Sequence, residues 1–200
     1  MDAFTPTTIA ALIIASSFAA GLNVYATLLT LGLLARAHWI ELPAGLDVLT
    51  HWWVIVVSGC MFAIEFVADK IPAFDMIWNG LHTFIRVPVA ALLAYQTSSK
   101  LSPEMQILAA VAGAGIALVS HGTKTAMRAA VTPSPEPVSN IALSTTEDVM
   151  AVGVTWLATK HPLIAAGIAC TLLVIAVITV RWLAKFIQKM WNKPRPANAQ

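Results

Sequence analysis

Charged side chains are scarce in this sequence. Asp, Glu, Lys and Arg make up 11% of its 200 residues, whereas 58% of the residues are hydrophobic. A soluble domain carries about 25% charged residues on average, so this composition does not suit a surface that faces water. We therefore expect an integral membrane protein. The net charge of +2 is too small to indicate a nucleic-acid partner.

Cysteines and cofactor motifs are lacking as well. The two cysteines, Cys60 and Cys170, each lie in the middle of an apolar segment, which predicts neither a disulfide framework nor a thiolate metal site. No Walker loop, dinucleotide fingerprint or Gly-x-Ser-x-Gly motif occurs, which argues against ATP-driven transport by this chain alone. We predict no cofactor and no metal site, because the histidines are scattered over positions 38, 51, 82, 121 and 161.

Long apolar segments dominate the chain instead. Because a helix needs about 20 apolar residues to cross a bilayer, the pattern predicts an all-α integral membrane protein of about six transmembrane helices. These lie near residues 8–36, 52–69, 77–97, 104–130, 140–159 and 162–188. The connections are short, so we expect residues 1–200 to form a single membrane domain. The first residues lack a basic n-region, so we predict no cleaved signal peptide.

Two of these segments are longer than a plain span requires. The first contains Gly21-Leu22-Asn23 and the fourth contains Ser120-His121-Gly122, so each has a glycine beside polar residues near its middle. This pattern favours a broken or kinked helix whose freed backbone groups face a cavity. The alternative is a long, tilted helix that tolerates a glycine.

The two halves of the chain resemble each other weakly. Ala68-Asp69-Lys70-Ile71-Pro72 and Ala158-Thr159-Lys160-His161-Pro162 both end a segment. They suggest a first repeat at about 8–97 and a second at about 104–188. Three crossings invert the second copy, and inverted repeats are common in secondary transporters. Matches this short also arise by chance in apolar sequence.

Lysine and arginine predict the orientation, because cytoplasmic loops are enriched in them. A basic cytoplasmic tail is expected at residues 189–200. The residues expected on the cytoplasmic side are Lys70, Lys124, Arg128, Arg181, Lys185, Lys189, Lys193 and Arg195, and those on the outer side are Arg36, Lys100 and Lys160. Six spans would then place both termini in the cytoplasm.

Acidic residues lie within or beside the apolar segments. An unpaired charge at the bilayer centre costs about 2.5–3.5 kcal/mol on insertion scales, so such residues usually mark a functional site. Glu65 and Asp69 share a helix face and precede Lys70, which indicates a proton or cation site or an interfacial salt-bridge cluster. Glu147 and Asp148 lie inside the fifth segment, where an acidic pair suits a proton relay.

Basic residues form a second group of candidates. Arg86, four residues after His82, has no charged neighbour in sequence and needs a carboxylate from another helix, such as Glu65, Glu147 or Asp148. His121, Lys124 and Arg128 follow helical spacing and form a cationic stripe. The stripe would bind an anionic substrate, hold carboxylates of a neighbouring helix, or simply mark a cytoplasmic helix end. Uncharged hydrogen-bonding capacity comes from Asn23 and Asn140.

Several strings in the chain are similar to those of one family. They are Gly-Leu-Asn-Val-Tyr-Ala-Thr (21–27), Glu-Phe-Val-Ala-Asp-Lys-Ile-Pro (65–72), His-Thr-Phe-Ile-Arg-Val-Pro (82–88), His-Gly-Thr-Lys (121–124) and Ser-Pro-Glu-Pro-Val-Ser-Asn-Ile-Ala-Leu-Ser (134–144), with Glu-Asp at 147–148. In these the chain resembles the bacterial membrane family called domain of unknown function 4126. The resemblance implies a multi-spanning protein of the bacterial inner membrane, and it implies no activity and no site residues.

Three functions remain open from the sequence. The first is a secondary transporter or channel for a small polar or charged solute or ion, of which a proton-coupled transporter is one form. The second is an intramembrane enzyme that uses His82 or His121 on a lipid headgroup. The third is a structural or assembly subunit whose buried charges specify packing. The expected partners are the lipid bilayer and the solute, and the small-residue run 109–115 also permits a homo-oligomer.

Overall fold

The structure, a computed structural model, consists of helices. It describes residues 4–131 and 137–191, apart from a few side chains, among them that of Asn140. Within this part there are seven α-helices, one 3₁₀ helix and no strand, so the all-α prediction is confirmed. The helices are α1 (Pro6–Leu22), α2 (Val24–Arg36), η1 (Ala44–Thr50), α3 (Trp52–Ala68), α4 (Pro72–Thr97), α5 (Pro103–Val131), α6 (Pro137–Lys160) and α7 (Pro162–Trp191).

Proline determines where most of the helices begin. Five of them, α1, α4, α5, α6 and α7, have proline as their first residue. At this position the missing N–H has no helical partner to lose, and the fixed φ suits the helix. Thr5 caps α1, since its hydroxyl accepts a hydrogen bond from the Thr8 N–H at 3.2 Å.

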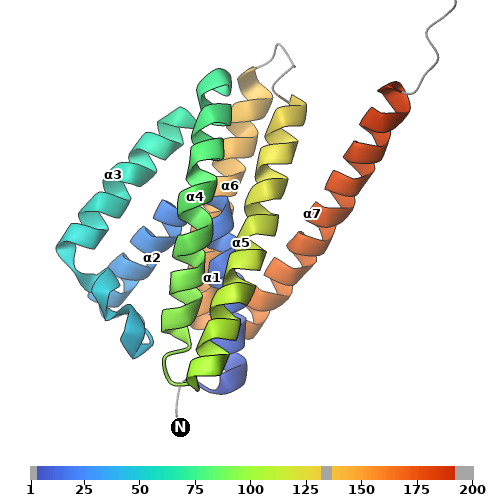
Figure 1. The fold of residues 1–200 in the computed structure, drawn as a ribbon. Helices are drawn as coiled ribbons and strands as arrows, with labels where there is room; N and C mark the ends of the chain where they lie inside the picture. The colour runs from blue at the N-terminus through green and yellow to red at the C-terminus, as the bar shows by residue number, and fades with distance from the viewer. Residues whose placement is uncertain (1–3, 132–136, 192–200) are drawn as a thin grey trace, which may run out of the picture.

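The first apolar segment does not cross the bundle. In Figure 1, α1 rises from the N-terminal end to the middle, and α2 returns to the same end. Consistent with this, Thr8 on α1 and Trp39 beyond α2 line one cavity together with Lys160. The Lys160 ammonium also donates to the Trp39 carbonyl oxygen at 2.7 Å. The segment is therefore a helical hairpin that turns back inside the bundle, called the re-entrant hairpin below, and its prediction as a single transmembrane span is not confirmed.

Asn23 forms the tip of this hairpin and explains the break. Its backbone is extended, with φ −150°, and its N–H donates to the Ala19 carbonyl oxygen at 2.9 Å. Its side-chain oxygen accepts from the Ala26 N–H at 2.9 Å, so Asn23 ends α1 and caps α2. Both limbs are apolar, which is why hydropathy alone does not distinguish the hairpin from a span.

The fourth segment, by contrast, is one continuous helix, so a break near Gly122 was wrongly expected. The hydroxyls of Thr123 and Thr125 bond to carbonyl oxygens of their own helix, and a Cβ at Gly122 would meet nothing within 4 Å. The close approach occurs at Gly21 instead, where a Cβ would lie 2.7 Å from the Ala117 carbonyl oxygen of α5. This glycine lets the end of α1 pass directly against α5.

Within residues 4–131 and 137–191, three helical stretches are long and apolar enough to cross a membrane. They are Ile77–Thr97 in α4, Pro103–Ala129 in α5 and Pro162–Lys185 in α7. The pair η1 and α3, bent by 68°, makes a fourth if it counts as one span. The inverted repeat is not confirmed, because the first half contains the hairpin whereas the second half consists of three continuous helices.

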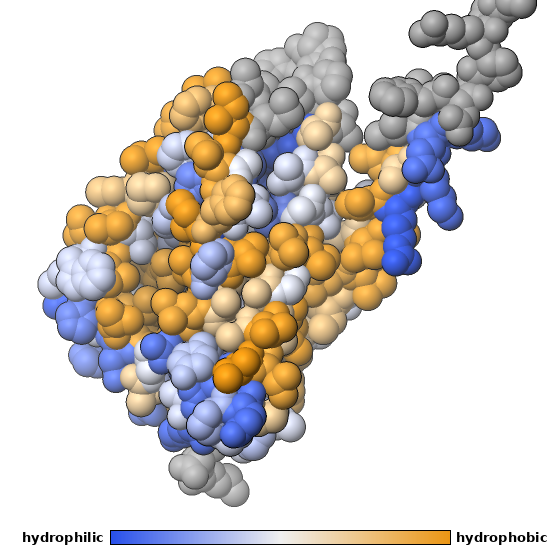
Figure 2. All heavy atoms as spheres, in the orientation of Figure 1, coloured by the Kyte–Doolittle hydropathy of each residue, from blue (hydrophilic) through white to orange (hydrophobic). Residues whose placement is uncertain are grey.

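The hairpin lies inside the bundle, where it positions the polar residues described below. α1 packs against α4, α5, α6 and α7, and Ala15, Ala19 and Ala20 have no exposed surface. Such small side chains allow close helix contact. Figure 2 shows hydrophobic residues over much of one outer face, with hydrophilic residues gathered at the lower end and near the end of α7.

The two ends of the described chain lie at opposite ends of the bundle. Phe4 lines the same cavity as Pro162, which begins α7, and α7 then runs 30 residues to the far end (Figure 1). Which side of a membrane each end faces is not shown by this arrangement, so the prediction that both termini lie in the cytoplasm stays a prediction. The turn of the first segment removes one of the six crossings on which that prediction depends.

We expect Thr7 and Lys189 to be accessible from opposite sides of the membrane. Each would be replaced by cysteine in a chain that carries Cys60→Ala and Cys170→Ala, and labelled with a membrane-impermeant maleimide. One of the two variants should react in intact cells and the other only in inverted vesicles. Labelling of both from the same side would contradict the re-entrant hairpin.

Candidate functional site

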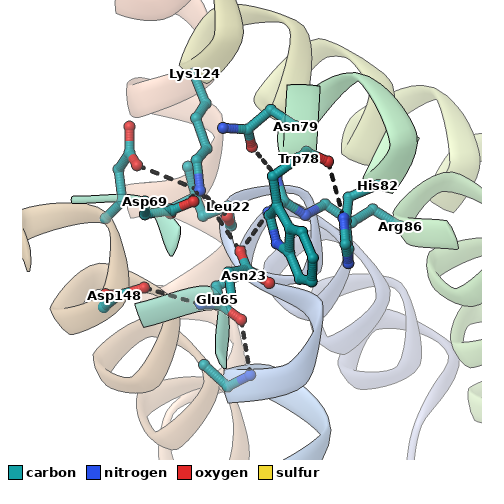
Figure 3. A network of polar contacts seen from close by, with 12 residues as sticks. Leu22, Asn23, Glu65, Asp69, Trp78, Asn79, His82, Arg86, Lys124 and Asp148 are labelled. Carbon is teal, nitrogen blue, oxygen red and sulfur yellow. Dashed lines mark hydrogen bonds and ion pairs between the residues drawn. The ribbon is translucent and has the colours of Figure 1, made fainter. Parts of the chain in front are cut away.

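A buried polar network surrounds the hairpin tip. It collects charged and amide side chains from the tip, α3, α4, α5 and α6 (Figure 3). Ten of the predicted residues are buried there: Asn23, Glu65, Asp69, His82, Arg86, His121, Lys124, Arg128, Glu147 and Asp148. These charged side chains therefore converge within the bundle. Their function is a separate question.

Arg86 connects α4 to α3. Its guanidinium donates to Glu65 Oε1, which confirms the predicted carboxylate partner. The same group donates to Asn79 Oδ1 at 3.0 Å and to His121 Nδ1 at 2.6 Å. Arg86 and Glu65 are both fully buried. Hydrogen bonds between ionised groups are about twice as strong as those between neutral groups, so this pair fixes α3 against α4.

His121 is held as a neutral imidazole by these contacts. A guanidinium only donates hydrogen bonds, so Nδ1 of His121 must accept and carries no proton. Nε2 then carries the proton and donates to the Asn79 carbonyl oxygen at 3.1 Å, with Thr83 Oγ1 at 2.8 Å. His121 therefore adds no positive charge to the predicted cationic stripe.

Lys124 lies at the centre of the network. Its ammonium donates to Asp69 Oδ2 at 2.8 Å and to the Leu22 carbonyl oxygen at 3.1 Å. It also lies 3.4 Å from Glu147 Oε2 and 3.6 Å from Glu65 Oε1. The Leu22 carbonyl belongs to the last turn of α1, where carbonyl groups lack helical partners and the helix dipole favours a cation. Lys124 thus ties the hairpin tip to α3, α5 and α6.

Arg128, one turn further along α5, joins Asp69 to Glu147. It donates to the Asp69 carbonyl oxygen at 2.9 Å, to Asp69 Oδ2 at 3.1 Å and to Glu147 Oε2 at 2.5 Å. Lys124 and Arg128 therefore hold carboxylates of neighbouring helices, which is one of the three alternatives that the sequence leaves open for the stripe. Neither cation is left available for a bound anion in this arrangement.

Asp148 is the carboxylate that stands apart. Its Oδ1 accepts from Asn23 Nδ2 at 2.8 Å, as Figure 3 shows. Its Oδ2 has no hydrogen-bond partner among the described residues, and it cannot be solvated by bulk water because the residue is only 4% exposed. Among the described residues, no Lys or Arg nitrogen is recorded within 4 Å of it, whereas Glu65, Asp69 and Glu147 each have such a partner. Counted over the described residues, the network therefore has four carboxylates for three cations.

His82 lies beside the network. Its Nδ1 donates to the Trp78 carbonyl oxygen at 2.8 Å, and its Nε2 lies 3.1 Å from the Tyr25 hydroxyl. Its ring stacks on that of Trp78 at a centroid distance of 4.3 Å. Sequence reasoning missed Tyr25 and Asn79. Asn79 had a signal, since positions 79, 82 and 86 share one face of α4.

Two of the predicted site residues, Lys70 and Asn140, are not part of the network of described side chains. The Lys70 ammonium donates to the Phe66 carbonyl oxygen at 2.8 Å and lies 3.0 Å above the Phe66 ring. Partial burial lowers the pKa of Lys70, which sits on the link between α3 and α4. Asn140 is on α6, and its side chain lies outside the described part.

Two cavities approach this region. One of about 440 Å³ begins at the N-terminal end and follows α1 past Thr8 and Leu12 to Ser16. The other, of about 400 Å³, opens sideways between α3 and α6 and has Asp148 in its lining. Within the described ranges, no cluster of three or more His, Cys, Asp or Glu could hold a metal ion.

Comparison with known proteins agrees with the resemblance seen in the sequence. The family described as Domain of unknown function (DUF4126) matches residues 10–182, which is most of the chain. The chain belongs to this family. No curated protein and no solved structure matches it. The matched range includes every residue of the network.

Breaking the pair of Arg86 and Glu65 should destabilise the fold strongly. Arg86→Met leaves the buried Glu65 carboxylate with only the Lys124 ammonium, 3.6 Å away. Removing one partner of a buried ion pair costs about 3–5 kcal/mol, whereas Arg86→Met with Glu65→Leu should restore most of the loss. Thermal unfolding in detergent measures both variants. Arg36→Met removes an exposed arginine that lies over the Trp52 ring, and it should cost about 1 kcal/mol or less. Equal small losses for Arg36→Met and Arg86→Met would contradict the network.

Proposed function

We propose that this chain is a secondary transporter or channel that moves a small polar or charged solute across a membrane, with the buried network as its site. The observation that carries this proposal is the network at the tip of a re-entrant hairpin. Transporters commonly bind substrate and coupling ion near the midplane, where helices are interrupted and their ends face the site. Here the interrupted helix ends at Leu22, and its carbonyl oxygen faces the Lys124 ammonium.

The charges favour a proton or another cation as the ion that is handled. Glu65 Oε2 and Asp148 Oδ2 are buried acceptors without a hydrogen-bond partner. An anion would first have to replace a carboxylate at Arg86 or Lys124. A proton on Asp148 needs no such exchange, and it would leave three carboxylates for three cations. We therefore assign proton coupling to Asp148, with Glu147 held by Arg128.

In this conformation, a solute that enters the end cavity from the N-terminal end of the bundle would reach no further than Ser16. That residue lines the inner part of the end cavity, and beyond it Ala19 and Ala20 are fully buried. The tip is held by Lys124 at Leu22 and by Asp148 at Asn23. Because Asp148 bonds directly to the tip, gain or loss of its proton would change one of these two attachments. This couples the proton to movement of the hairpin.

We further propose that the membrane is the cytoplasmic membrane of a bacterium and that five helices, α3 to α7, cross it. The positive-inside rule then places the C-terminal end of α7 in the cytoplasm. Lys70 and the basic residues of α7 lie at that end, whereas Arg36, Lys100 and Lys160 lie at the other. The N-terminal end faces outward in this arrangement.

The two other functions have less support. Both ring nitrogens of His82 and of His121 are engaged in hydrogen bonds, so neither histidine is poised as an acid or base on a lipid headgroup. A purely structural network would balance its charges, yet the described part has an extra carboxylate. A structural role predicts that Asp148 variants change stability and nothing else.

Proton movement into liposomes tests the proposal. The purified chain would be reconstituted around a pH-sensitive dye, with a potassium diffusion potential applied in the absence and presence of sodium, ammonium, phosphate or quaternary ammonium ions. We expect proton flux above that of empty liposomes in at least one condition. Asp148→Asn should abolish it, since the amide keeps an acceptor for Asn23 but binds no proton.

The matched control is Glu104→Gln, which removes an exposed carboxylate at the start of α5. This variant should retain the full flux. Unchanged flux in Asp148→Asn, or flux at the level of empty liposomes in every condition, would contradict the proposal. Thermal unfolding of the same samples separates loss of function from loss of fold.

A further inference from the structure

The sideways opening between α3 and α6 has an unusual composition. It measures about 400 Å³ and is lined by Phe62, Phe66, Thr145, Asp148, Val149, Val152 and Gly153. Six of these seven residues are apolar or hydroxyl-bearing, and the seventh is a carboxylate. Pockets for small organic ligands typically measure about 300–1,000 Å³ and combine apolar walls with a few placed polar groups. The opening has the size and lining of such a pocket.

The carboxylate in the lining of this opening is buried and has an oxygen without a hydrogen-bond partner among the described residues. Only 4% of the Asp148 surface is exposed, and its Oδ2 has no hydrogen-bond partner among the described residues. Its other oxygen is held by Asn23 at 2.8 Å, which fixes the direction of the group. A buried unpaired charge is costly unless a partner or a proton neutralises it. The pocket therefore lacks one positive charge.

The walls suit a cation that carries apolar groups. The rings of Phe62 and Phe66 lie 6.2 Å apart and are tilted by 58°, and aromatic faces attract organic cations. The Lys70 ammonium already lies 3.0 Å above the Phe66 ring, so this ring accepts a cation on one face. A strongly hydrated ion such as sodium would gain little from these walls.

We propose that Asp148 and this opening form a binding site for a lipophilic monovalent cation, such as a quaternary ammonium compound, which competes with a proton for the carboxylate. The proposal rests on the proposed function and names the substrate class for the same network. Entry is from the side, between α3 and α6, where an amphiphilic cation would arrive from the lipid. Binding of the cation releases the proton from Asp148, so the two are exchanged one for one.

The surrounding charges permit this exchange. The groups whose fields reach Asp148 are Glu65 and Asp69 on α3, Lys124 on α5, and Lys70 between α3 and α4, with Glu147 adjacent on α6. α2 has no charged residue before Arg36, and α7 has none before Arg181. The cations Lys124 and Arg128 are each bonded to other carboxylates. An incoming cation thus meets Asp148 without having to break an ion pair.

Binding of benzyltrimethylammonium to the purified full chain in detergent tests the site. Calorimetry in buffers of different ionisation enthalpy measures both the binding and the number of protons released. We expect one cation bound per chain and up to one proton released. Once Asp148 is protonated, each unit of pH decrease should weaken binding about tenfold. Neopentylbenzene, which has the same shape without the charge, should compete poorly.

Two variants and their controls locate the site. Asp148→Asn should weaken binding by about tenfold or more, because the charge-assisted contact is lost. Gly153→Leu should block the opening without disturbing the helix, since a Cβ there meets nothing within 4 Å. Gly167→Leu, at an equally open position on α7, and Glu104→Gln should bind normally. Size-exclusion profiles confirm that each variant is folded.

The outcomes distinguish this inference from the proposed function. Equal binding in Asp148→Asn, equal affinity for neopentylbenzene, or no saturable binding would overturn the lipophilic-cation site. Proton flux with other solutes but no binding of the probe would overturn this inference alone. Binding that depends on Asp148, with no flux in any liposome experiment, would overturn the transport proposal alone.

Discussion

The contact on which the rest of this structure depends is the Lys124 ammonium at the hairpin tip. It joins the last turn of α1 to carboxylates on α3 and α6. Without a cation there, the Leu22 carbonyl oxygen at the end of α1 would lose its partner, and three carboxylates would be left to share Arg86 and Arg128. A buried charge without a partner destabilises a protein by several kcal/mol. The re-entrant hairpin and the ion-pair network therefore require each other.

A charge imbalance within that network gives the site its chemistry. Glu65, Asp69 and Glu147 are paired with Arg86, Lys124 and Arg128, which leaves Asp148 bonded to Asn23 and to no cation in the described part of the chain. A fully paired network would be a rigid structural element. Under the proposed function, an extra carboxyl that bonds to the tip of a re-entrant helix would link a proton, or a cation that replaces it, to the position of the hairpin. This is the physical basis for assigning transport to the chain.

Much of the fold could be predicted from hydropathy and proline positions, because both act locally. The bounds of α3 to α7 and the break at Asn23 followed from the residues. The direction of α2 could not be predicted, since two apolar limbs look the same whether the chain continues or turns back. The site residues were found because charges in apolar segments are costly. Their pairing could not be found, because it depends on how five helices pack, and Tyr25 gave no signal in its apolar surroundings.

The central claim is that one carboxyl in the network, Asp148, carries a proton. Infrared spectroscopy of the purified chain measures this directly, because a protonated carboxylic acid has a C=O stretching band that a carboxylate lacks. The account predicts such a band at neutral pH in the wild-type chain and in Glu104→Gln. It also predicts that the band disappears in Asp148→Asn. A band that persists in Asp148→Asn, or no band in the wild-type chain, would contradict it.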